Sequence, residues 1–262
     1  MQIATFNVNS IKARWDIFQA WLKEAKPDVA LLQELKCVNE NFPTEEVKKL
    51  GYHSAVAGQK TYNGVAVLSK TPITVELTAL PGDPADDHAR YIEVTLPGRV
   101  RVASVYVPNG QSVGSDAYAY KLKFYRRLYE HVKYLLQKEE VFVLGGDFNV
   151  APEEIDVHNP GAWQGEVLFS QPERAALRSL FHLGMLDAWR AANPKAEEYS
   201  WWDYRQGAFE RNDGLRIDHL LLSPQAADLL EASAIDLKPR KMEKPSDHAP
   251  VTARLSFPAH SN

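Results

Sequence analysis

The chain has 262 residues, of which 45% are hydrophobic and 24% charged, and its formal net charge at pH 7 is −4. These proportions are typical of a globular protein and exclude a disordered or collagen-like chain. The acidic balance argues against a protein held to nucleic acid by bulk charge, but it does not argue against a local basic groove. Cys37, the single cysteine, excludes an internal disulfide and a cysteine-built zinc site.

Localisation and domain number follow from the same survey. No apolar stretch approaches the ~20 residues that span a bilayer, and the first residues begin a strand-like pattern instead of a signal peptide. No linker or low-complexity tract divides the sequence. We therefore expect one domain over residues 1–262, in a reduced, cytoplasmic protein with no membrane association. We also expect a monomer, because no amphipathic segment is left over for a partner.

Secondary structure is predicted from hydrophobic spacing. Short apolar runs predict strands over 3–8, 29–32, 65–68, 91–96, 100–107, 141–144, 220–222 and 251–257. Apolar residues three and four apart predict helices over 15–25, 118–136, 175–183 and 226–232. Pro97-Gly98 predicts a hairpin turn, and 152–165 a long irregular loop. Strands and helices alternate loosely with hairpins between them, which indicates a layered α/β fold instead of an all-parallel sheet.

Acid, amide and imidazole side chains recur where predicted strands meet loops. The six segments are Asn7-Val8-Asn9, Gln33-Glu34-Leu35-Lys36, Pro108-Asn109-Gly110, Gly145-Gly146-Asp147-Phe148-Asn149, Ile217-Asp218-His219 and Ser246-Asp247-His248. Taken singly, each has an ordinary explanation: Glu34 as a capping or solvent carboxylate, Gly145-Gly146-Asp147 as a glycine turn with an Asx cap, and Asn109-Gly110 as a turn. Strand ends in layered sheets share an edge, so six such segments favour one functional site.

The residue types limit the chemistry of that site. Carboxylate and amide oxygens suit Mg²⁺ or Mn²⁺. The sequence contains no His-Glu-x-x-His helix, phosphate loop, dinucleotide fingerprint or Gly-x-Ser-x-Gly elbow. The class of reaction that these residue types still favour is metal-assisted hydrolysis of a phosphate ester. In that chemistry a cation neutralises the phosphate, and a carboxylate orients or deprotonates the attacking water. A histidine held by an aspartate stabilises the charge that develops on the phosphate.

Seven segments, in order over residues 1–257, match the motifs of one family. They are Thr5 to Ala13, Leu32 to Lys36, Tyr106 to Gly110, Gly146 to Pro152, Ser200 to Arg205, Gly214 to His219 and Ser246 to Pro250. With them the chain resembles the exonuclease III family of abasic-site endonucleases, within the endonuclease/exonuclease/phosphatase superfamily. The Gly-Asp-Phe-Asn and Ser-Asp-His motifs mark only the superfamily. The Asn-Gly, Trp-Trp-Asp-Tyr-Arg and Leu-Arg-Ile-Asp segments narrow the resemblance to its DNA-repair branch.

The resemblance implies a fold and an activity. The fold is a four-layered α/β sandwich, two packed mixed β-sheets flanked by helices. The activity is Mg²⁺- or Mn²⁺-dependent cleavage of double-stranded DNA 5′ to abasic sites, as in base excision repair, leaving a 3′-hydroxyl and a 5′-deoxyribose phosphate. A 3′→5′ exonuclease, 3′-phosphodiesterase or 3′-phosphatase activity accompanies it. The alternative is an enzyme that mainly trims blocked 3′ ends and incises abasic sites little.

The family's catalytic residues fall on five positions of this sequence. Asp147 matches the residue that activates or positions the attacking water, or protonates the leaving oxygen. Asn149 matches the neighbouring residue that hydrogen-bonds to the phosphate. Tyr106 matches a phosphate contact. His248 matches the imidazole on the scissile phosphate, paired with Asp218.

The resemblance also implies the metal ligands. Glu34 matches the metal ligand, with Asn7 and Asp247 close to the ion. Some relatives carry Asp where this chain has Asn9, which weakens metal binding on that side and leaves a second metal site in doubt.

A third group of positions is implied to contact DNA. These residues are Asn109, Gln111, Trp201, Arg205, Leu215 and Ile217, of which Trp201, Leu215 and Ile217 match a small pocket for a flipped-out deoxyribose lacking its base. Trp201 and Trp202 also fit a pair of core aromatics. Two basic stretches fit either a solvated surface or contacts to the DNA backbone: Lys121, Lys123, Arg126 and Arg127, then Lys238, Arg240, Lys241 and Lys244.

Two other functions compete with this interpretation. The same superfamily core serves nonspecific nucleases, inositol-phosphate phosphatases and sphingomyelinases; the predicted lack of export disfavours the secreted lipid enzymes, and the Trp201 segment favours DNA repair. A catalytically silent DNA-binding module is disfavoured because it needs none of the acids and imidazole, and clustered carboxylates repel phosphate unless a metal is bound.

Overall fold

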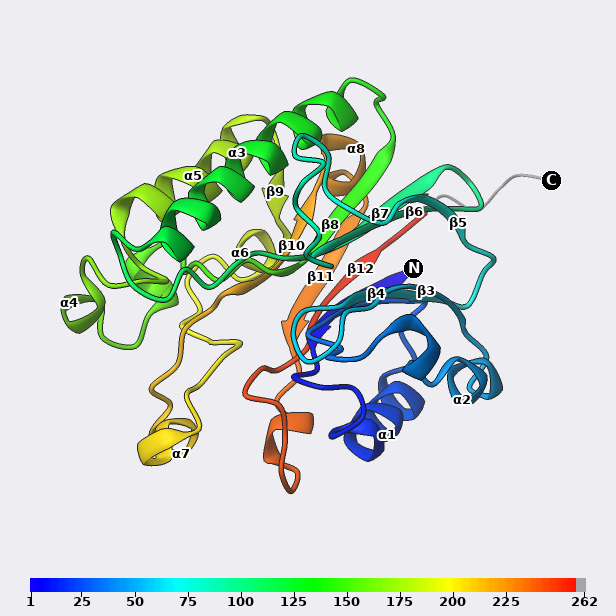
Figure 1. Cartoon of the computed structure of the whole chain (residues 1–262), viewed down its shortest axis with the longest axis horizontal. Coiled ribbons are helices and arrows are strands. Elements are labelled where there is room, and N and C mark those ends of the chain that lie inside the picture. The colour runs from blue at the N-terminus through cyan, green and yellow to red at the C-terminus, as the bar shows by residue number, and fades with distance from the viewer. Residues whose placement is uncertain (258–262) are drawn as a thin grey trace.

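Two six-stranded β-sheets packed face to face form the centre of the computed structural model, which describes residues 1–257 (Figure 1). The first sheet has the strand order β11 (Leu230–Ile235), β12 (Val251–Leu255), β1 (Gln2–Asn7), β2 (Val29–Gln33), β4 (Val65–Ser69), β3 (His53–Ala57). The second has the order β5 (Thr74–Leu77), β6 (Tyr91–Leu96), β7 (Val100–Tyr106), β8 (Val141–Asp147), β10 (Asp218–Leu222), β9 (Leu186–Asp187). Each sheet has one parallel pair, β1 with β2 and β7 with β8, among antiparallel neighbours. The expected sandwich of two mixed sheets is confirmed.

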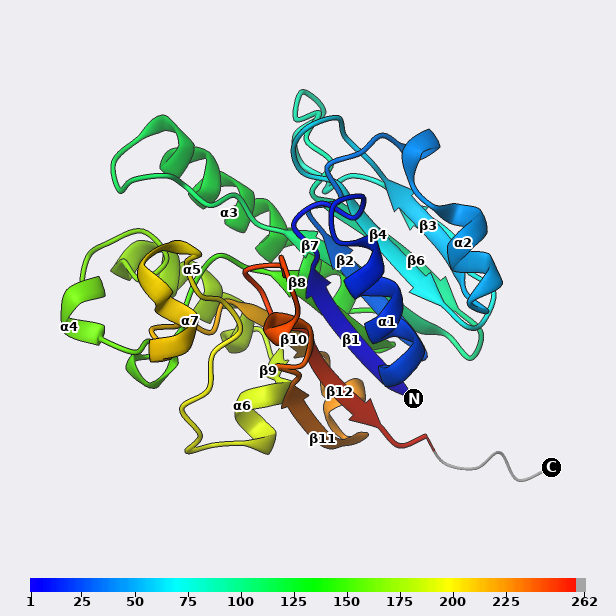
Figure 2. The ribbon, with the colours of Figure 1, turned by 90° about the horizontal axis from the view of Figure 1, so that it is seen from below.

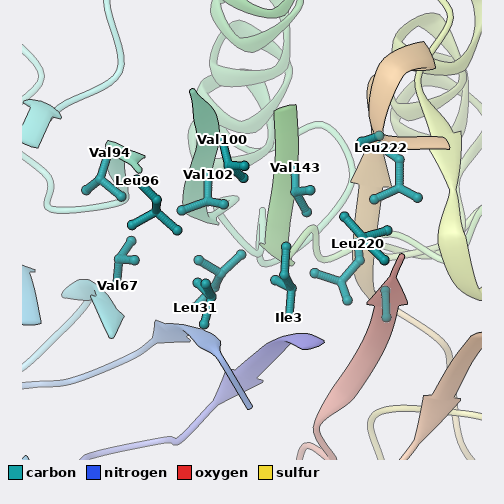
Figure 3. Packing of buried hydrophobic residues seen from close by; sticks show 14 of the residues in the cluster. Ile3, Leu31, Val67, Val94, Leu96, Val100, Val102, Val143, Leu220 and Leu222 are labelled. Atoms are coloured by element: carbon teal, nitrogen blue, oxygen red, sulfur yellow. The ribbon is translucent and has the colours of Figure 1, made fainter. Parts of the chain in front are cut away.

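The core between the sheets follows from side-chain alternation along the strands. Ile3 and Leu31 of the first sheet point toward Val102, Val143 and Leu220 of the second (Figure 3). Because successive residues of a strand face opposite sides, the neighbours of Ile3 and Leu31 face outward, toward the helices. The strand carrying Ile3 thereby has one apolar face for the other sheet and another for a helix.

Helices cover both outer faces, as Figures 1 and 2 show. The longer ones are α1 (Trp15–Ala25) and α2 (Thr44–Lys49) over the first sheet, and α3 (Asp116–Leu136) and α5 (Gln171–His182) over the second. In α1, Phe18 and Trp21 join a buried cluster with Phe6 of β1 and Leu32 of β2. The short helices are α4 (Pro160–Trp163), α6 (Ala188–Ala192), α7 (Ala208–Arg211) and α8 (Pro224–Ala227), and 3₁₀ turns lie at 39–41, 154–156, 205–207 and 239–241. Among the described residues no helix is long and apolar enough to cross a membrane.

The predicted helix over 226–232 is wrong beyond Ala227. Helix α8 ends at Ala227, and Leu230–Ile235 is the edge strand β11, paired with β12. Small and polar residues alternate in this segment, so the strand pairing outweighs its weak helical spacing. The sequence did not predict strands β3, β5 and β9. Strand β5 is largely exposed and β9 has only two residues, so neither carries a clear apolar pattern. The predicted loop 152–165 contains a 3₁₀ turn and α4.

Candidate active site

The polar strand ends meet at one edge of the sandwich. Tyr106 at the end of β7 and Asp218 at the start of β10 are both register partners of Asp147, the last residue of β8. In the first sheet β1 ends at Asn7 and β2 just before Glu34. Asn7 bridges the two sheets, because its Nδ2 donates to Glu34 Oε1 at 2.8 Å and to Asp147 Oδ2 at 2.9 Å.

A group of potential metal ligands lies at this edge. Glu34, Asp147 and His248 each offer one ligand atom, and these atoms all lie within 4.8 Å of one another. Two carboxylates beside an amide are the donor set that a hard divalent cation prefers, so the residues present fit such an ion. Asn7 donates to both carboxylates, so in this structure it orients the ligands through its nitrogen.

His248 forms a buried pair with Asp218. Its Nδ1 lies 2.9 Å from Asp218 Oδ2, and Ser200 Oγ donates to the same oxygen at 2.7 Å. Burial lowers the pKa of His248, but the carboxylates of Asp218, Asp147 and Asp247 outweigh it and raise this pKa to about 10. His248 is therefore an imidazolium at neutral pH. Its Nε2, 3.7 Å from Asp147 Oδ2, is suited to stabilise an anion instead of ligating a metal.

Asp147 is 1% exposed at the centre of the group. Its pKa is raised to about 7, mainly by burial; the charge of His248 lowers it, and the charges of Asp218 and Glu34 contribute to the rise. The backbone N–H of Asn149 donates to Oδ1 at 2.9 Å and fixes the carboxylate. A carboxyl group that titrates near neutrality can accept or donate a proton during hydrolysis.

Gly145 and Gly146, ahead of Asp147, lie inside β8 and do not form a turn. A Cβ on Gly145 would lie 2.5 Å from a Leu31 methyl, and one on Gly146 would lie 1.9 Å from the Val105 carbonyl oxygen. The explanation as a glycine turn is therefore wrong, although the Asp147 side chain does cap the backbone two residues on. Because neither glycine has a side chain, the neighbouring strand and the other sheet can approach β8 closely. This close packing positions Asp147 at the edge of the sheets.

A second row of polar groups lies beside Asp147. Asn149 Nδ2 donates to the Val107 carbonyl at 2.9 Å, and Asn109 Nδ2 donates to Asn149 Oδ1 at 3.1 Å. Burial, followed by the charges of Glu34 and Asp147, raises the pKa of Tyr106 well above its ordinary value, so its phenol stays protonated and can donate. Motif reasoning missed Arg90, whose guanidinium stacks on the Tyr106 ring.

Asp247, expected near the metal, does not belong to the ligand group. Its Oδ1 accepts from Asn9 Nδ2 at 2.9 Å and its Oδ2 from Trp201 Nε1 at 3.0 Å. Both oxygens are thus already hydrogen-bonded, and Asp247 instead ties together the loops that carry Asn9 and Trp201.

The residues expected to contact DNA divide into exposed and buried ones. Gln111 and Arg205 are exposed, and Trp201 is partly exposed. Leu215 and Ile217 are 0% and 1% exposed, in a cluster with Leu168 and Phe169. The apolar pocket that the resemblance implied is therefore not open at these two residues in this structure.

Three members of the basic stretches are buried structural cations, so neither alternative, a solvated surface or contact with the DNA backbone, describes them. Lys121 is fully buried and pairs with Glu173. Arg127 pairs with Asp86, and Arg240 stacks on Phe209. The other five residues are exposed: Lys123, Arg126, Lys238, Lys241 and Lys244.

Comparisons with known proteins identify the family of this chain. Residues 4–248 match the model of the endonuclease/exonuclease/phosphatase family. Exodeoxyribonuclease III of Haemophilus influenzae is 37% identical, over 97% of this chain and all of that protein. The structure of a 3′-5′ exonuclease from Neisseria meningitidis is 40% identical with a TM-score of 0.95, covering 98% of this chain and 100% of the other. That of an AP endonuclease from Archaeoglobus fulgidus is 39% identical with a TM-score of 0.94 and the same coverage.

The chain belongs to the endonuclease/exonuclease/phosphatase family, a class whose layered fold it shares. Within that class it is a hydrolytic DNA-repair nuclease of the exonuclease III family, as its relatives show. The family is metal-dependent, in agreement with the acidic group at the edge of the sheets.

Proposed function

We propose that the protein hydrolyses phosphodiester bonds of duplex DNA with Mg²⁺ or Mn²⁺, incising 5′ to abasic sites in base excision repair. The observation that carries this proposal is the gathering of Glu34, Asp147 and the His248–Asp218 pair within one small space. Gln111 and Arg205 are exposed, as contact with a duplex substrate requires. The Archaeoglobus relative, described as an AP endonuclease, supports the choice of substrate. We further propose that the enzyme acts as a single-domain monomer in the cytoplasm, where it would meet chromosomal DNA.

Each residue has a defined task in this reaction. Glu34 would hold the ion, oriented by Asn7, and the ion when bound would supply positive charge at the phosphate. Asp147 takes the proton of the attacking water or supplies one to the leaving 3′-oxygen. His248 donates from Nε2 to a phosphate oxygen, while Asp218 keeps it charged and oriented. Tyr106, Asn109 and Asn149 would donate hydrogen bonds to the phosphate.

A second candidate function is removal of nucleotides or blocking groups from 3′ ends, with little incision at abasic sites. The observation that favours it is the complete burial of Leu215 and Ile217, since a closed pocket would not admit a flipped-out sugar. A Neisseria structure 40% identical to this chain, with a TM-score of 0.92, is described as a 3′ phosphatase bound to a product DNA hairpin.

Cleavage of a labelled duplex with one stable abasic-site analogue separates the two functions. It is compared with an intact duplex, each with Mg²⁺ and with chelator. We expect a single Mg²⁺-dependent cut at the lesion, lost in Asp147→Asn. Shortening of both duplexes from the 3′ end, with the lesion ignored, would favour the second function. An Asp147→Asn protein with full turnover would refute the role of that residue, and absence of any cleavage would refute both functions.

A further inference from the structure

Lys121 of α3 has a fully buried ammonium next to the proposed phosphate contacts. Its side chain is 0% exposed. The Nζ donates to the backbone carbonyl of Asn109 at 3.0 Å and to that of Asn149 at 2.7 Å. It also donates to a carboxylate oxygen of Glu173. An ammonium has three N–H groups, so these three acceptors use all of them, and Lys121 has neither exposure nor a free donor for contact with DNA in this structure.

The two carbonyls belong to residues whose side chains are proposed to bind the phosphate. Asn109 follows β7 and Asn149 follows β8, so the two residues lie on separate loops. Their side chains are already joined, since Asn109 Nδ2 donates to Asn149 Oδ1 at 3.1 Å. Lys121 joins the same two residues through their backbones. It is therefore a second link between the loops and holds them at a fixed separation.

The backbone of Asn149 has a conformation that its surroundings must impose. Its φ angle is 51°, in the left-handed region that non-glycine residues rarely adopt. The N–H of Asn149 donates to Asp147 Oδ1 at 2.9 Å, and the carbonyl of Asn149 accepts from Lys121. The ammonium thus fixes the same residue whose N–H orients the Asp147 carboxylate.

Glu173 of α5 supplies the counter-charge for the buried ammonium. Its side chain is also 0% exposed. The carboxylate oxygen that does not bind Lys121 accepts from the backbone N–H of Ser170 at 2.9 Å and from Ser170 Oγ. Burial lowers the pKa of Lys121, and the charge of Glu173 opposes this fall. Helix α5 therefore holds Lys121 in place from the side opposite the two loops.

We infer that Lys121 is a positioning residue for the hydrolysis, one that keeps the amides of Asn109 and Asn149 directed at the phosphate without touching DNA itself. This inference rests on the proposed function. Hydrogen bonds from the two amides would strengthen as negative charge develops on the phosphate oxygens. A shift of the loops should therefore cost mainly transition-state stabilisation, which lowers kcat more than it raises KM.

Steady-state kinetics of the full-length enzyme on the abasic-site duplex and on the intact duplex test the inference. On whichever substrate the wild type cleaves, Lys121→Met should lower kcat about tenfold or more and change KM by less than about threefold. Lys133→Met replaces an exposed lysine of the same helix and should behave as wild type.

A second variant guards against loss of folding. Lys121→Met alone leaves the carboxylate of Glu173 buried without its cation. Lys121→Met combined with Glu173→Gln leaves neither charge, and the glutamine oxygen can still accept from Ser170. We expect this double variant to fold, as thermal unfolding would verify, and to show the same loss of kcat as Lys121→Met.

A double-mutant cycle with Asn149→Ala separates positioning from a general structural effect. Asn149→Ala already removes one amide and the partner of the Asn109 amide, so adding the Lys121→Met/Glu173→Gln pair should lower kcat by less than about threefold more. An equal further loss in both backgrounds, a loss confined to KM, or a kcat within about twofold of wild type would overturn the inference and leave the proposed function standing. A wild type that cleaves neither duplex would overturn both.

Discussion

The Arg90 guanidinium carbon lies 4.7 Å from the centre of the Tyr106 ring, and Arg90 Nη1 donates to the Tyr106 carbonyl at 3.2 Å. The backbone N–H of Tyr106 in turn donates to the Arg90 carbonyl at 2.8 Å. One residue therefore holds both the ring and the backbone of the phenol proposed to face the phosphate. A cation over an aromatic ring contributes about 0.5–2 kcal/mol, enough to select one ring position.

Replacement of Arg90 should slow turnover without weakening substrate binding equally. In Arg90→Met we expect kcat to fall about tenfold with a smaller change in KM, because a misoriented donor is lost mainly from the transition state. Arg90→Lys, which keeps the charge, should recover part of the rate. Steady-state kinetics on the abasic-site duplex measures both, with the exposed Arg99→Met as control. Equal kcat in Arg90→Met and wild type would show that Tyr106 does not depend on Arg90.

The His248–Asp218 pair sets the expected pH dependence. The protonated imidazole is the active form, and its pKa of about 10 places the alkaline loss of activity near that pH. Asp218→Asn removes a charge that raises this pKa, so the alkaline limb of kcat/KM should move toward neutral pH. Profiles from about pH 6 to about pH 10.5 measure the shift. An unmoved limb would contradict the assignment.

The same pair has a consequence for stability. The pKa of His248 in the folded state lies above its ordinary value of 6.5. Its contribution to stability is therefore fully present below pH 6.5 and is lost as the pH rises through about 10. Urea unfolding of wild type and Asp218→Asn at either end of this window should show a difference that shrinks at alkaline pH.

Arg216 anchors the segment that leads into Asp218. It is fully buried; its Nε donates to Asp156 Oδ1 at 2.8 Å and its Nη1 to Asp187 Oδ2 at 2.7 Å. Arg216→Met leaves the buried Asp187 without its arginine and Asp156 with Arg190 alone, so we expect a loss of about 3–5 kcal/mol in the free energy of unfolding. The exposed ion pair of Arg254 with Glu231 is the control. Arg254→Met should change the free energy of unfolding by less than about 1 kcal/mol.

Acid should weaken this network. Burial raises the pKa of Asp187, but the charge of Arg216 outweighs it and holds this pKa well below the ordinary value of 3.8. The contribution of Asp187 to stability is therefore present above pH 3.8 and is lost as the pH falls through its lowered pKa. Urea unfolding followed downward from neutral pH should show the difference between wild type and Arg216→Met shrinking in acid.

Gly146 should not accept even a methyl group. Because the added Cβ would meet a backbone oxygen at 1.9 Å, β7 and β8 would have to separate. We expect Gly146→Ala to lose about 3 kcal/mol or more of stability and to displace Asp147, reducing activity in the folded fraction as well. At Gly161 the nearest atom to an added Cβ is 3.7 Å away, so Gly161→Ala should behave as wild type. Thermal unfolding and incision assays compare the two.

Leu168 combines a φ of 78° with 4% exposure, in the same cluster as Leu215 and Ile217. Leu168→Gly relieves an unfavourable backbone conformation but leaves a cavity, for a net destabilisation of about 1–3 kcal/mol. The opened cluster should raise incision at an abasic site relative to trimming of an intact 3′ end. An unchanged ratio would show that Leu168 does not limit access to the pocket.

Sequence spacing predicts much of this site because the polar residues directly follow strongly apolar strands. Asn7, Glu34 and Asp147 were expected at one edge for that reason, and the structure brings them together. Asp218 and His248 were paired through the family resemblance, and the structure places them in contact. The longest helices and most strands carry apolar patterns clear enough to predict within a few residues.

Other features depend on partners that no local pattern reveals. Lys121 belongs to a basic stretch, but the fold buries it against Glu173, more than 50 residues away in sequence. Arg90 has no motif around it, and only the pairing of β6 with β7 brings it beside Tyr106. A run of basic residues close together in sequence therefore suggested an exposed surface. In the structure Lys121 of that run instead forms a buried ion pair.

The placement of β1 between β2 and β12 has a consequence for synthesis of the protein (Figure 2). His248 is synthesised more than 200 residues after Asn7. A growing chain that still lacks the segment before β12 has neither the imidazolium nor the neighbour of its first strand. With the roles proposed for Asn7 and His248, DNA cleavage would begin only after the last strand of the first sheet has been added, so folding of that sheet and activation would coincide.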